Sequence, residues 1–271
     1  MLTYVEYGKE NKYDDDIFFQ KYSQMSRSQQ GLAGAGEWET LRKLLPDFKD
    51  KRVLDLGCGY GWHCIYAMEH GASSVVGVDI SHKMLEVAKE KTHFPQVEYK
   101  CCAIEDVEFP EESFDVILSS LAFHYVADYE ILVKKIYRIL KSGGKLVFTV
   151  EHPVFTAYGT QDWYYNEKGE ILHFPVDNYY YEGKRTAVFL GEKVTKFHRT
   201  LTTYLNTLLS NGFIINHIVE PQPPEYMMDI PGMQDEMRRP MMLIVSANKK
   251  VDRLAEVDNK NYLQLRNNVL V

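Results

Sequence analysis

The feature that most constrains the fold is residues 53–61, VLDLGCGYG, where an apolar run meets three glycines at alternate positions. A short apolar run of this kind is typical of a buried strand. Glycine accepts backbone conformations with φ > 0 and places no side chain between the backbone and a ligand. In open α/β sheets, nucleotide ligands bind beyond the carboxyl ends of the strands, next to such turns. The segment therefore predicts an α/β sheet with a ligand site at this edge.

Short apolar strands alternate with helices on both sides of this turn. We expect strands at 52–56, 74–79, 97–101, 114–119 and 145–151, with helices at 62–70, 81–91 and 129–140 between them. Such alternation indicates a parallel sheet covered on both faces. A further helix (200–211) precedes two successive strands (213–220 and 241–247), which suggest an antiparallel pair. The predicted fold is a doubly wound, mostly parallel, seven-stranded α/β sheet with an antiparallel edge strand.

Charge and composition narrow the classes of partner. The net charge is −7, and no basic patch is visible, so we expect no nucleic-acid partner. No apolar run approaches the roughly 20 residues of a membrane span, and the N-terminus lacks the features of a signal peptide. The four cysteines (Cys58, Cys64, Cys101 and Cys102) form no C-x-x-C pair, so we expect reduced thiols, no metal site and a cytoplasmic protein.

The spacing of the glycines separates two classes of nucleotide ligand. A dinucleotide fingerprint reads G-x-G-x-x-G, whereas here Trp62 stands where its third glycine would allow close packing. Asp55 lies just before the turn, where its charge would repel a pyrophosphate and suit a ligand with a positive amino group. The next strand ends at Asp79, whose carboxylate can accept both hydroxyls of a ribose. The alternative is that Asp79 only caps the helix that begins near Ser81.

With these two elements in order, the sequence resembles the class I S-adenosylmethionine-dependent methyltransferases, and most of all their small-molecule branch, known as type 11. The motif D-L-G-C-G-x-G and the strand ending in G-V-D carry the resemblance, which covers residues 50–150 and, by pattern, the last helix and two strands. It implies that the chain binds S-adenosylmethionine and releases S-adenosylhomocysteine.

The resemblance also implies roles for residues at matching positions. Asp55 and the turn (Gly57, Cys58, Gly59 and Gly61) would hold the amino and carboxylate groups of the methionine part, and Asp79 would bind the ribose. The other implied cofactor contacts are Ile80, Met84, Ile104 and Glu105 around the adenine, and Ser119 and Leu121 on the methionine side. The family segment after the third strand often reads D-A-E-D-L-P-F. Here Ala103 replaces its first Asp, so a backbone contact must serve the adenine amino group.

The N-terminal residues are more numerous than the sheet requires. Tyr22 and Arg27 could fold over the cofactor, with Arg27 pairing with the methionine carboxylate. The alternative is core packing for the aromatic residues and a solvated Arg27. Three glycines indicate a loop over residues 26–36.

The periodic pattern breaks at residues 152–196, where nine of the 27 residues from 155 to 181 are aromatic. We expect this insertion to cover the substrate, with Tyr158, Trp163, Tyr180 and His198 as pocket candidates. Glu151 and His152 lie at the end of the fifth strand, and His124 lies in the loop after the fourth. These three are the catalytic candidates, although His124 could merely order its loop.

We therefore expect an enzyme that transfers a methyl group from S-adenosylmethionine to a small molecule, by in-line displacement in a closed pocket. The alternatives are a non-catalytic S-adenosylmethionine-binding module or an NAD-linked oxidoreductase. The acceptor atom and the oligomeric state stay open. The expected segments are an N-terminal cap (1–45), the cofactor-binding half (46–151), the substrate-covering insertion (152–196), the C-terminal helix and strands (197–248) and a polar tail (249–271).

Overall fold

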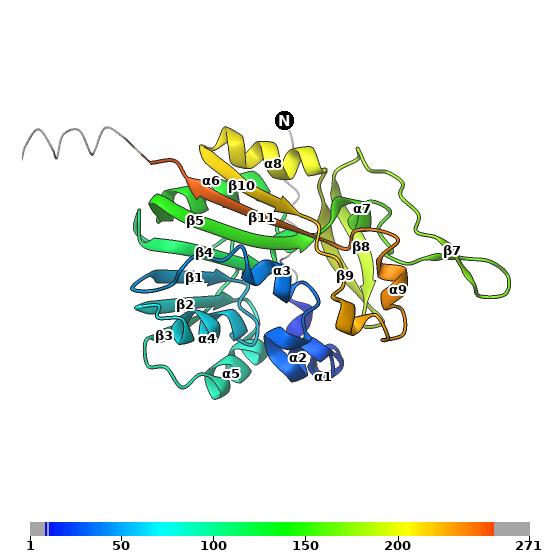
Figure 1. Cartoon of the computed structure of the whole chain (residues 1–271), viewed down its shortest axis with the longest axis horizontal. Coiled ribbons are helices and arrows are strands. Elements are labelled where there is room, and N and C mark those ends of the chain that lie inside the picture. Colours follow the sequence, from blue (N-terminus) through cyan, green and yellow to red (C-terminus); the bar gives the residue numbers. More distant parts are fainter. Residues whose placement is uncertain (1–8, 10, 252–271) are drawn as a thin grey trace, which may run out of the picture.

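A computed structural model describes residue 9 and residues 11–251 of the chain; the tail beyond residue 251 therefore lies outside the described residues. Its centre is a seven-stranded sheet in the order β10-β11-β5-β4-β1-β2-β3 (Figure 1). The strands are β1 (Arg52–Leu56), β2 (Ser74–Asp79), β3 (Val97–Cys101), β4 (Phe114–Ser120), β5 (Leu140–Glu151), β10 (Phe213–Val219) and β11 (Met242–Lys249). Strands β1 to β5 pair in parallel, and β11 runs antiparallel to both β5 and β10.

The predicted fold class is confirmed, including the antiparallel pair at the sheet edge. The reversed strand, β11, lies one position in from that edge, because β10 occupies the edge itself. The start of β5 differs from the prediction. This strand begins at Leu140, immediately after the preceding helix, and its pairing with β4 shifts register before Lys145. Burial of Leu140 against the core draws this segment into the sheet, where the sequence had indicated only a helix stop.

Five helices cover the two faces of the sheet: α3 (Trp38–Arg42), α4 (Trp62–Glu69), α5 (His82–Lys91), α6 (Tyr129–Ile139) and α8 (Leu201–Ser210). Successive strand residues point to opposite faces. Leu54 of β1 packs in the cluster that contains α6 and α8, whereas Val53 packs in the cluster that contains α3 and α4. This double burial explains why the strands are apolar at consecutive positions.

The N-terminal segment forms short helices in place of the predicted loop. It contains η1 (Lys12–Asp14), α1 (Asp16–Ser23), α2 (Ser26–Gln30) and η2 (Gly31–Gly34). The prediction of a loop over residues 26–36 was thus wrong for most of its length. A side chain at Gly34 would lie 2.3 Å from the carbonyl oxygen of Ser26, so this glycine allows two helical turns to pack tightly.

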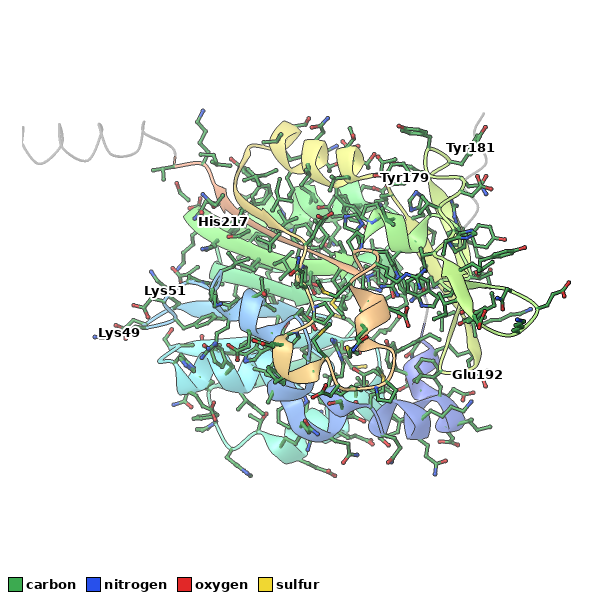
Figure 2. All side chains as sticks on the ribbon, turned by 45° about the vertical axis from the view of Figure 1, so that its right-hand side comes forward. Lys49, Lys51, Tyr179, Tyr181, Glu192 and His217 are labelled. Carbon is green, nitrogen blue, oxygen red and sulfur yellow. The ribbon has the colours of Figure 1, made fainter. Side chains whose placement is uncertain are left out.

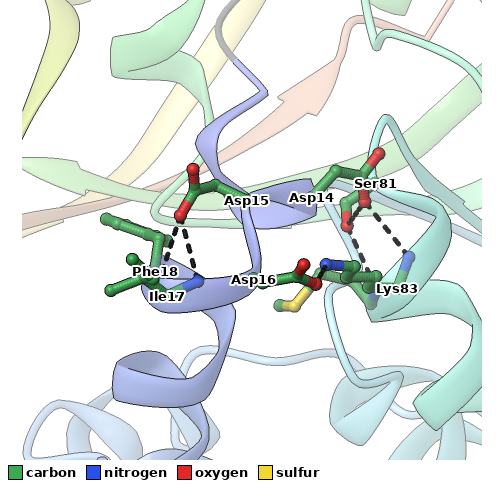
Figure 3. A network of polar contacts seen from close by, with 8 residues as sticks. Asp14, Asp15, Asp16, Ile17, Phe18, Ser81 and Lys83 are labelled. Atoms are coloured by element: carbon green, nitrogen blue, oxygen red, sulfur yellow. Dashed lines mark hydrogen bonds and ion pairs between the residues drawn. The ribbon is translucent and has the colours of Figure 1, made fainter.

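The segment docks on the start of α5 (Figure 3). The hydroxyl of Ser81 donates to Asp14 Oδ1 over 2.6 Å, and the backbone N–H of Lys83 donates to the same oxygen over 3.2 Å. Asp15 caps α1 by accepting from the N–H groups of Ile17 and Phe18. These contacts fix the N-terminal segment beside the carboxyl end of β2.

The insertion forms α7 (Pro153–Thr156) and two antiparallel hairpins, β6 (Tyr164–Tyr165) with β7 (Ile171–His173), and β8 (Gly183–Phe189) with β9 (Glu192–His198). It lies at the carboxyl ends of the parallel strands, together with η4 (Glu225–Met227) and α9 (Met233–Glu236) from the loop before β11 (Figure 1). No helix in the described part of the chain is long and apolar enough to cross a membrane.

Candidate active site

A cavity of about 230 Å³ opens where the carboxyl ends of β1, β2, β4 and β5 meet the N-terminal helices and the insertion. One end, here called the nucleoside end, is lined by Gly57, Gly59, Asp79, Ile80, Met84, Ile104 and Glu105. The other, here called the acceptor end, is lined by Tyr13, His124, Tyr125, Glu151, Phe189 and Met242. The cavity therefore has a polar, glycine-lined end and an aromatic end that contains one carboxylate and one imidazole.

The glycine turn brings bare backbone to the nucleoside end. Gly57 and Gly59 have φ values of 79° and 52° and line the cavity. A Cβ atom on Gly57 would lie 2.4 Å from the Cβ atom of Ala122, so no other residue fits there without movement. Cys58 and Gly61 do not line the cavity. Gly61 instead allows the hydroxyl of Tyr99 to approach closely, since a Cβ atom would lie 2.2 Å from it.

Asp79 joins the glycine turn to the start of α5, a helix whose N-cap is Ser81. Its Oδ1 accepts from the N–H of Ser81 over 2.9 Å, and its Oδ2 accepts from the N–H of Gly59 over 2.8 Å. Asp79 also lines the cavity, and each carboxylate oxygen has a second lone pair. Burial raises the pKa of Asp79, although the backbone hydrogen bonds from Ser81 and Gly59 oppose this effect. The carboxylate thus fixes the turn and can still accept from a ligand.

Besides Cys58 and Gly61, two more of the residues expected to touch the cofactor, Asp55 and Ser119, lie behind the cavity wall. Asp55 is 1% exposed, and its Oδ2 accepts from the Cys64 thiol over 3.4 Å. Its Oδ1 has no hydrogen-bond partner among the described residues. Burial raises the pKa of Asp55 to about 7. The hydroxyl of Ser119 donates to the carbonyl of Leu56 over 2.7 Å, so it joins β4 to β1.

Leu121 lies at the end of β4 and lines the cavity in an uncommon backbone conformation, with a φ of 54°. Such conformations cost about 1–3 kcal/mol and persist only where surrounding contacts enforce them. Here the backbone N–H of Leu121 donates to two oxygens of Thr149, the side-chain hydroxyl and the backbone carbonyl, both at 3.0 Å. The chain is thereby turned sharply at the junction of the two ends of the cavity.

The N-terminal segment supplies Tyr22 and Arg27 to the cavity lining, as the sequence led us to expect. Arg27 Nη2 lies 2.9 Å from both carboxylate oxygens of Glu37, which is 3% exposed. The charge of Arg27 is therefore already matched within the N-terminal segment.

At the acceptor end, His124 and Glu151 lie side by side. His124 is 2% exposed, and its Nδ1 accepts from the backbone N–H of Glu151 over 3.4 Å. Burial lowers the pKa of His124 to about 4, so the ring is neutral at pH 7. A neutral ring that accepts at Nδ1 carries its proton on Nε2. His124 can therefore offer an N–H donor at this end of the cavity.

Sequence reasoning missed two residues that hold Glu151. Lys196 of β9 lies 2.5 Å from Glu151 Oε1, and Gln161 donates to Glu151 Oε2 over 2.6 Å. A signal was present in the sequence: Val194, Lys196 and His198 alternate along one strand, and all three are buried. A lysine on the inward face of such a strand predicts a buried ionic partner.

The other candidates in and beside the insertion do not line the cavity. His152 Nε2 lies 2.8 Å from Glu220 Oε1, and His198 is held between the hydroxyl of Thr156 and the carbonyl of Tyr179. Tyr158 and Tyr180 are 46% and 87% exposed. The predicted pocket residues Tyr158, Tyr180 and His198, and the catalytic candidate His152, therefore lie outside this cavity.

Part of the aromatic density of the insertion has a packing role. The guanidinium of Arg239 lies 4.5, 4.8 and 5.1 Å from the ring centres of Phe155, Phe174 and Trp163. Cation–π contacts of this kind stabilise a buried arginine. These rings thereby join the insertion to the segment that precedes β11.

The β8–β9 hairpin closes the cavity by docking on the N-terminal helices. Figure 2 shows Glu192 at the end of this hairpin nearest those helices, away from Tyr179 and Tyr181. Glu192 lies 3.7 Å from the ammonium groups of Lys12 and Lys21. Phe18 packs edge-on against Phe189, whose ring also lines the cavity. The acceptor end is thus covered from both sides.

Similarity to known proteins extends over most of the chain. The family described as methyltransferase domain matches residues 54–148. A crystal structure from Listeria monocytogenes, assigned to the S-adenosylmethionine dependent methyltransferases, is 58% identical, with a TM-score of 0.78; the match covers 81% of this chain and 99% of that one. An S-adenosylmethionine dependent methyltransferase from Mesorhizobium loti is 41% identical, with a TM-score of 0.75, over 80% and 100% of the two chains. An uncharacterised protein of Haemophilus influenzae is 34% identical over 89% of this chain and 98% of its own length.

Proposed function

Since the chain belongs to the class I S-adenosylmethionine-dependent methyltransferases, we propose that it transfers the methyl group of this cofactor to a small molecule held at the acceptor end. The observation that carries the proposal is the division of one cavity into a glycine-lined nucleoside end and a covered aromatic end. Phe189 and the N-terminal helices cover part of the second end, which favours a small acceptor over a folded macromolecule.

The nucleoside end fits the cofactor. Bare backbone at Gly57 and Gly59 leaves space for the methionine part, and Asp79 has lone pairs for the ribose hydroxyls. The apolar side chains of Ile80, Met84 and Ile104 would lie on the adenine. When bound, S-adenosylmethionine supplies an electrophilic methyl group attached to a sulfonium. The NAD-linked alternative has no support from this turn, where Trp62 follows the last glycine.

The residues of the chain favour direct in-line transfer by alignment and exclusion of water. Alignment of the reactants can account for much of the rate enhancement in such reactions. The β8–β9 hairpin and the N-terminal segment would limit the access of water to the acceptor end. His124 can donate from Nε2, and Glu151 can accept a proton or a hydrogen bond from a protonated nucleophile. We include Tyr22 and Arg27 as a cover for the methionine part, and we propose the cytoplasm as the compartment.

The small-molecule assignment is tested by incubating the purified protein with methyl-tritiated S-adenosylmethionine and two fractions of a cell extract. One fraction contains compounds below about 1 kDa, and the other contains the macromolecules. We expect tritium to enter the low-mass fraction. Tritium that enters only protein or nucleic acid would contradict the proposal.

We predict that Asp79→Ala weakens binding of S-adenosylmethionine at least tenfold, or about 1.4 kcal/mol, because the hydrogen bonds to the ribose are lost. Titration calorimetry at constant pH measures the effect. The matched control is Glu90→Ala, which removes an exposed carboxylate from the neighbouring helix α5. An unchanged affinity in Asp79→Ala would exclude Asp79 from the ribose site.

A further inference from the structure

The acceptor end contains an ion pair that crosses from the sheet to the insertion. Glu151 is the last residue of β5, whereas Lys196 belongs to β9. The two charged groups are 2.5 Å apart, and the side chains are 13% and 3% exposed. Burying two charges is costly unless both are paired and hydrogen-bonded. Here Gln161 bridges the pair, donating to Glu151 Oε2 over 2.6 Å and accepting from Lys196 over 2.8 Å.

The two partners face the cavity differently. Glu151 lines the cavity, whereas Lys196 lies behind the wall. The ammonium group of Lys196 lies 5.4 Å from the ring centre of Phe189 and 5.9 Å from that of Tyr125, and both rings line the acceptor end. A ligand at this end would therefore contact the carboxylate of Glu151 directly. It would feel the positive charge of Lys196 through the cavity wall, without contact.

Three other ionisable side chains lie near this end. His124 is neutral at pH 7, because burial lowers its pKa to about 4. Arg199 is 5% exposed and donates to backbone carbonyls, among them that of Ala127 at 2.9 Å. Lys9, which also lines the cavity, is paired with Asp106. Glu151 is thus the carboxylate that a cation at the acceptor end would meet, and Lys196 already neutralises it.

Burial raises the pKa of Glu151, but the electrostatic interactions with His124 and Lys196 and the hydrogen bonds from Lys196 and Gln161 outweigh burial, so that the pKa lies below its ordinary value. Glu151 consequently remains a hydrogen-bond acceptor at neutral pH. Beside it, His124 offers an N–H donor. This pair of groups matches an uncharged hydroxyl, which both donates and accepts.

We infer that Lys196 is a specificity-determining residue, which neutralises and orients Glu151 so that the acceptor end selects an uncharged hydroxyl-bearing compound over a cationic one. The inference rests on the proposed function, since it assigns the chemical class of the methyl acceptor. It also gives the insertion a direct role in acceptor choice, because Lys196 and Gln161 both come from that segment.

The test uses two probes of the same shape and different charge, 2-phenylethanol and 2-phenylethylammonium, with the full chain saturated with S-adenosylhomocysteine at pH 7.5. Ligand-observed NMR titrations give the two dissociation constants. We expect the wild type to bind the alcohol at least tenfold more tightly than the cation. In Lys196→Met this ratio should shift at least tenfold towards the cation, because a nearby like charge has been removed.

Three variants control for structural damage. Lys196→Arg keeps the charge and should keep the preference of the wild type. Lys193→Met removes an exposed charge from the same strand and should change nothing. If Lys196→Met does not fold, the double variant Glu151→Gln/Lys196→Met takes its place. It removes both buried charges and should still bind the alcohol more tightly than the cation.

The inference is overturned if the wild type binds the cation as tightly as the alcohol, if it binds neither probe, or if the ratio is unchanged in Lys196→Met. A cation preference in the double variant would overturn it as well. S-adenosylhomocysteine binding is measured first in each protein. A wild type that does not bind S-adenosylhomocysteine would refute the proposed function itself. Failure of the proposed function is thereby distinguished from failure of the inference about Lys196.

Discussion

Replacement of Gly57 by alanine is expected to reduce the affinity for S-adenosylmethionine at least 100-fold, or about 2.7 kcal/mol. Gly57 has a φ of 79°, and a Cβ atom there would lie 2.4 Å from the Cβ atom of Ala122. Neither atom belongs to the end of a flexible side chain, so the backbone of the turn or of the loop after β4 must move. Both segments line the cavity, and a displacement of either would close the space for the methionine part.

Gly169→Ala provides a matched control for backbone strain. Gly169 also has a φ of 79°, but a Cβ atom there would meet no heavy atom within 4 Å. Both substitutions therefore place alanine at the same unfavourable φ, and only the first adds a steric clash. Titration calorimetry and thermal unfolding of both variants separate loss of binding from loss of stability. Affinity within threefold of the wild type in Gly57→Ala would contradict the placement of the cofactor at this turn.

Asp55 should make the ligand-free protein less stable as the pH rises from 5 to 8. Burial raises its pKa to about 7 in the folded chain, compared with about 3.9 for an unfolded one. The folded state therefore binds more protons than the unfolded state between these values. The stabilisation is fully present below about pH 4 and is lost as the pH rises through 7. Over the measured interval the loss amounts to about 2.6 kcal/mol.

The corresponding variant is Asp55→Asn, which cannot ionise. Between pH 5 and pH 8 we expect its free energy of unfolding in urea to fall by about 2.6 kcal/mol less than that of the wild type. Asp229→Asn, at an exposed position, should follow the wild type. Parallel profiles for Asp55→Asn and the wild type would show that this carboxyl group titrates normally.

The sheet could be predicted well because its signal is local. Val53 and Leu54 pack on opposite faces, so β1 had to be apolar at consecutive positions, and its bounds were predicted without error. The bounds of β2 and β3 were also correct. The N-terminal helices were not predicted, because they depend on distant contacts such as that between Asp14 and Ser81.

The acceptor end was predicted only in part, and the reason is again distance along the chain. Glu151 and His124 were identifiable because the first ends β5 and the second follows β4, and the carboxyl ends of both strands face the site. Lys196 lies 45 residues beyond Glu151, and only the folded insertion brings the two together at 2.5 Å. The role of Arg239 was also hidden from the sequence. Composition alone could not reveal that its guanidinium packs over the rings of Phe155, Phe174 and Trp163.

A crystal structure of the protein with S-adenosylhomocysteine tests the central claim most directly. We expect the ribose hydroxyls within hydrogen-bond distance of Asp79, the amino-acid part against Gly57 and Gly59, and the sulfur directed towards Glu151 and His124. Electron density for the adenosyl group outside this cavity, or a sulfur atom directed away from the aromatic end, would contradict the account.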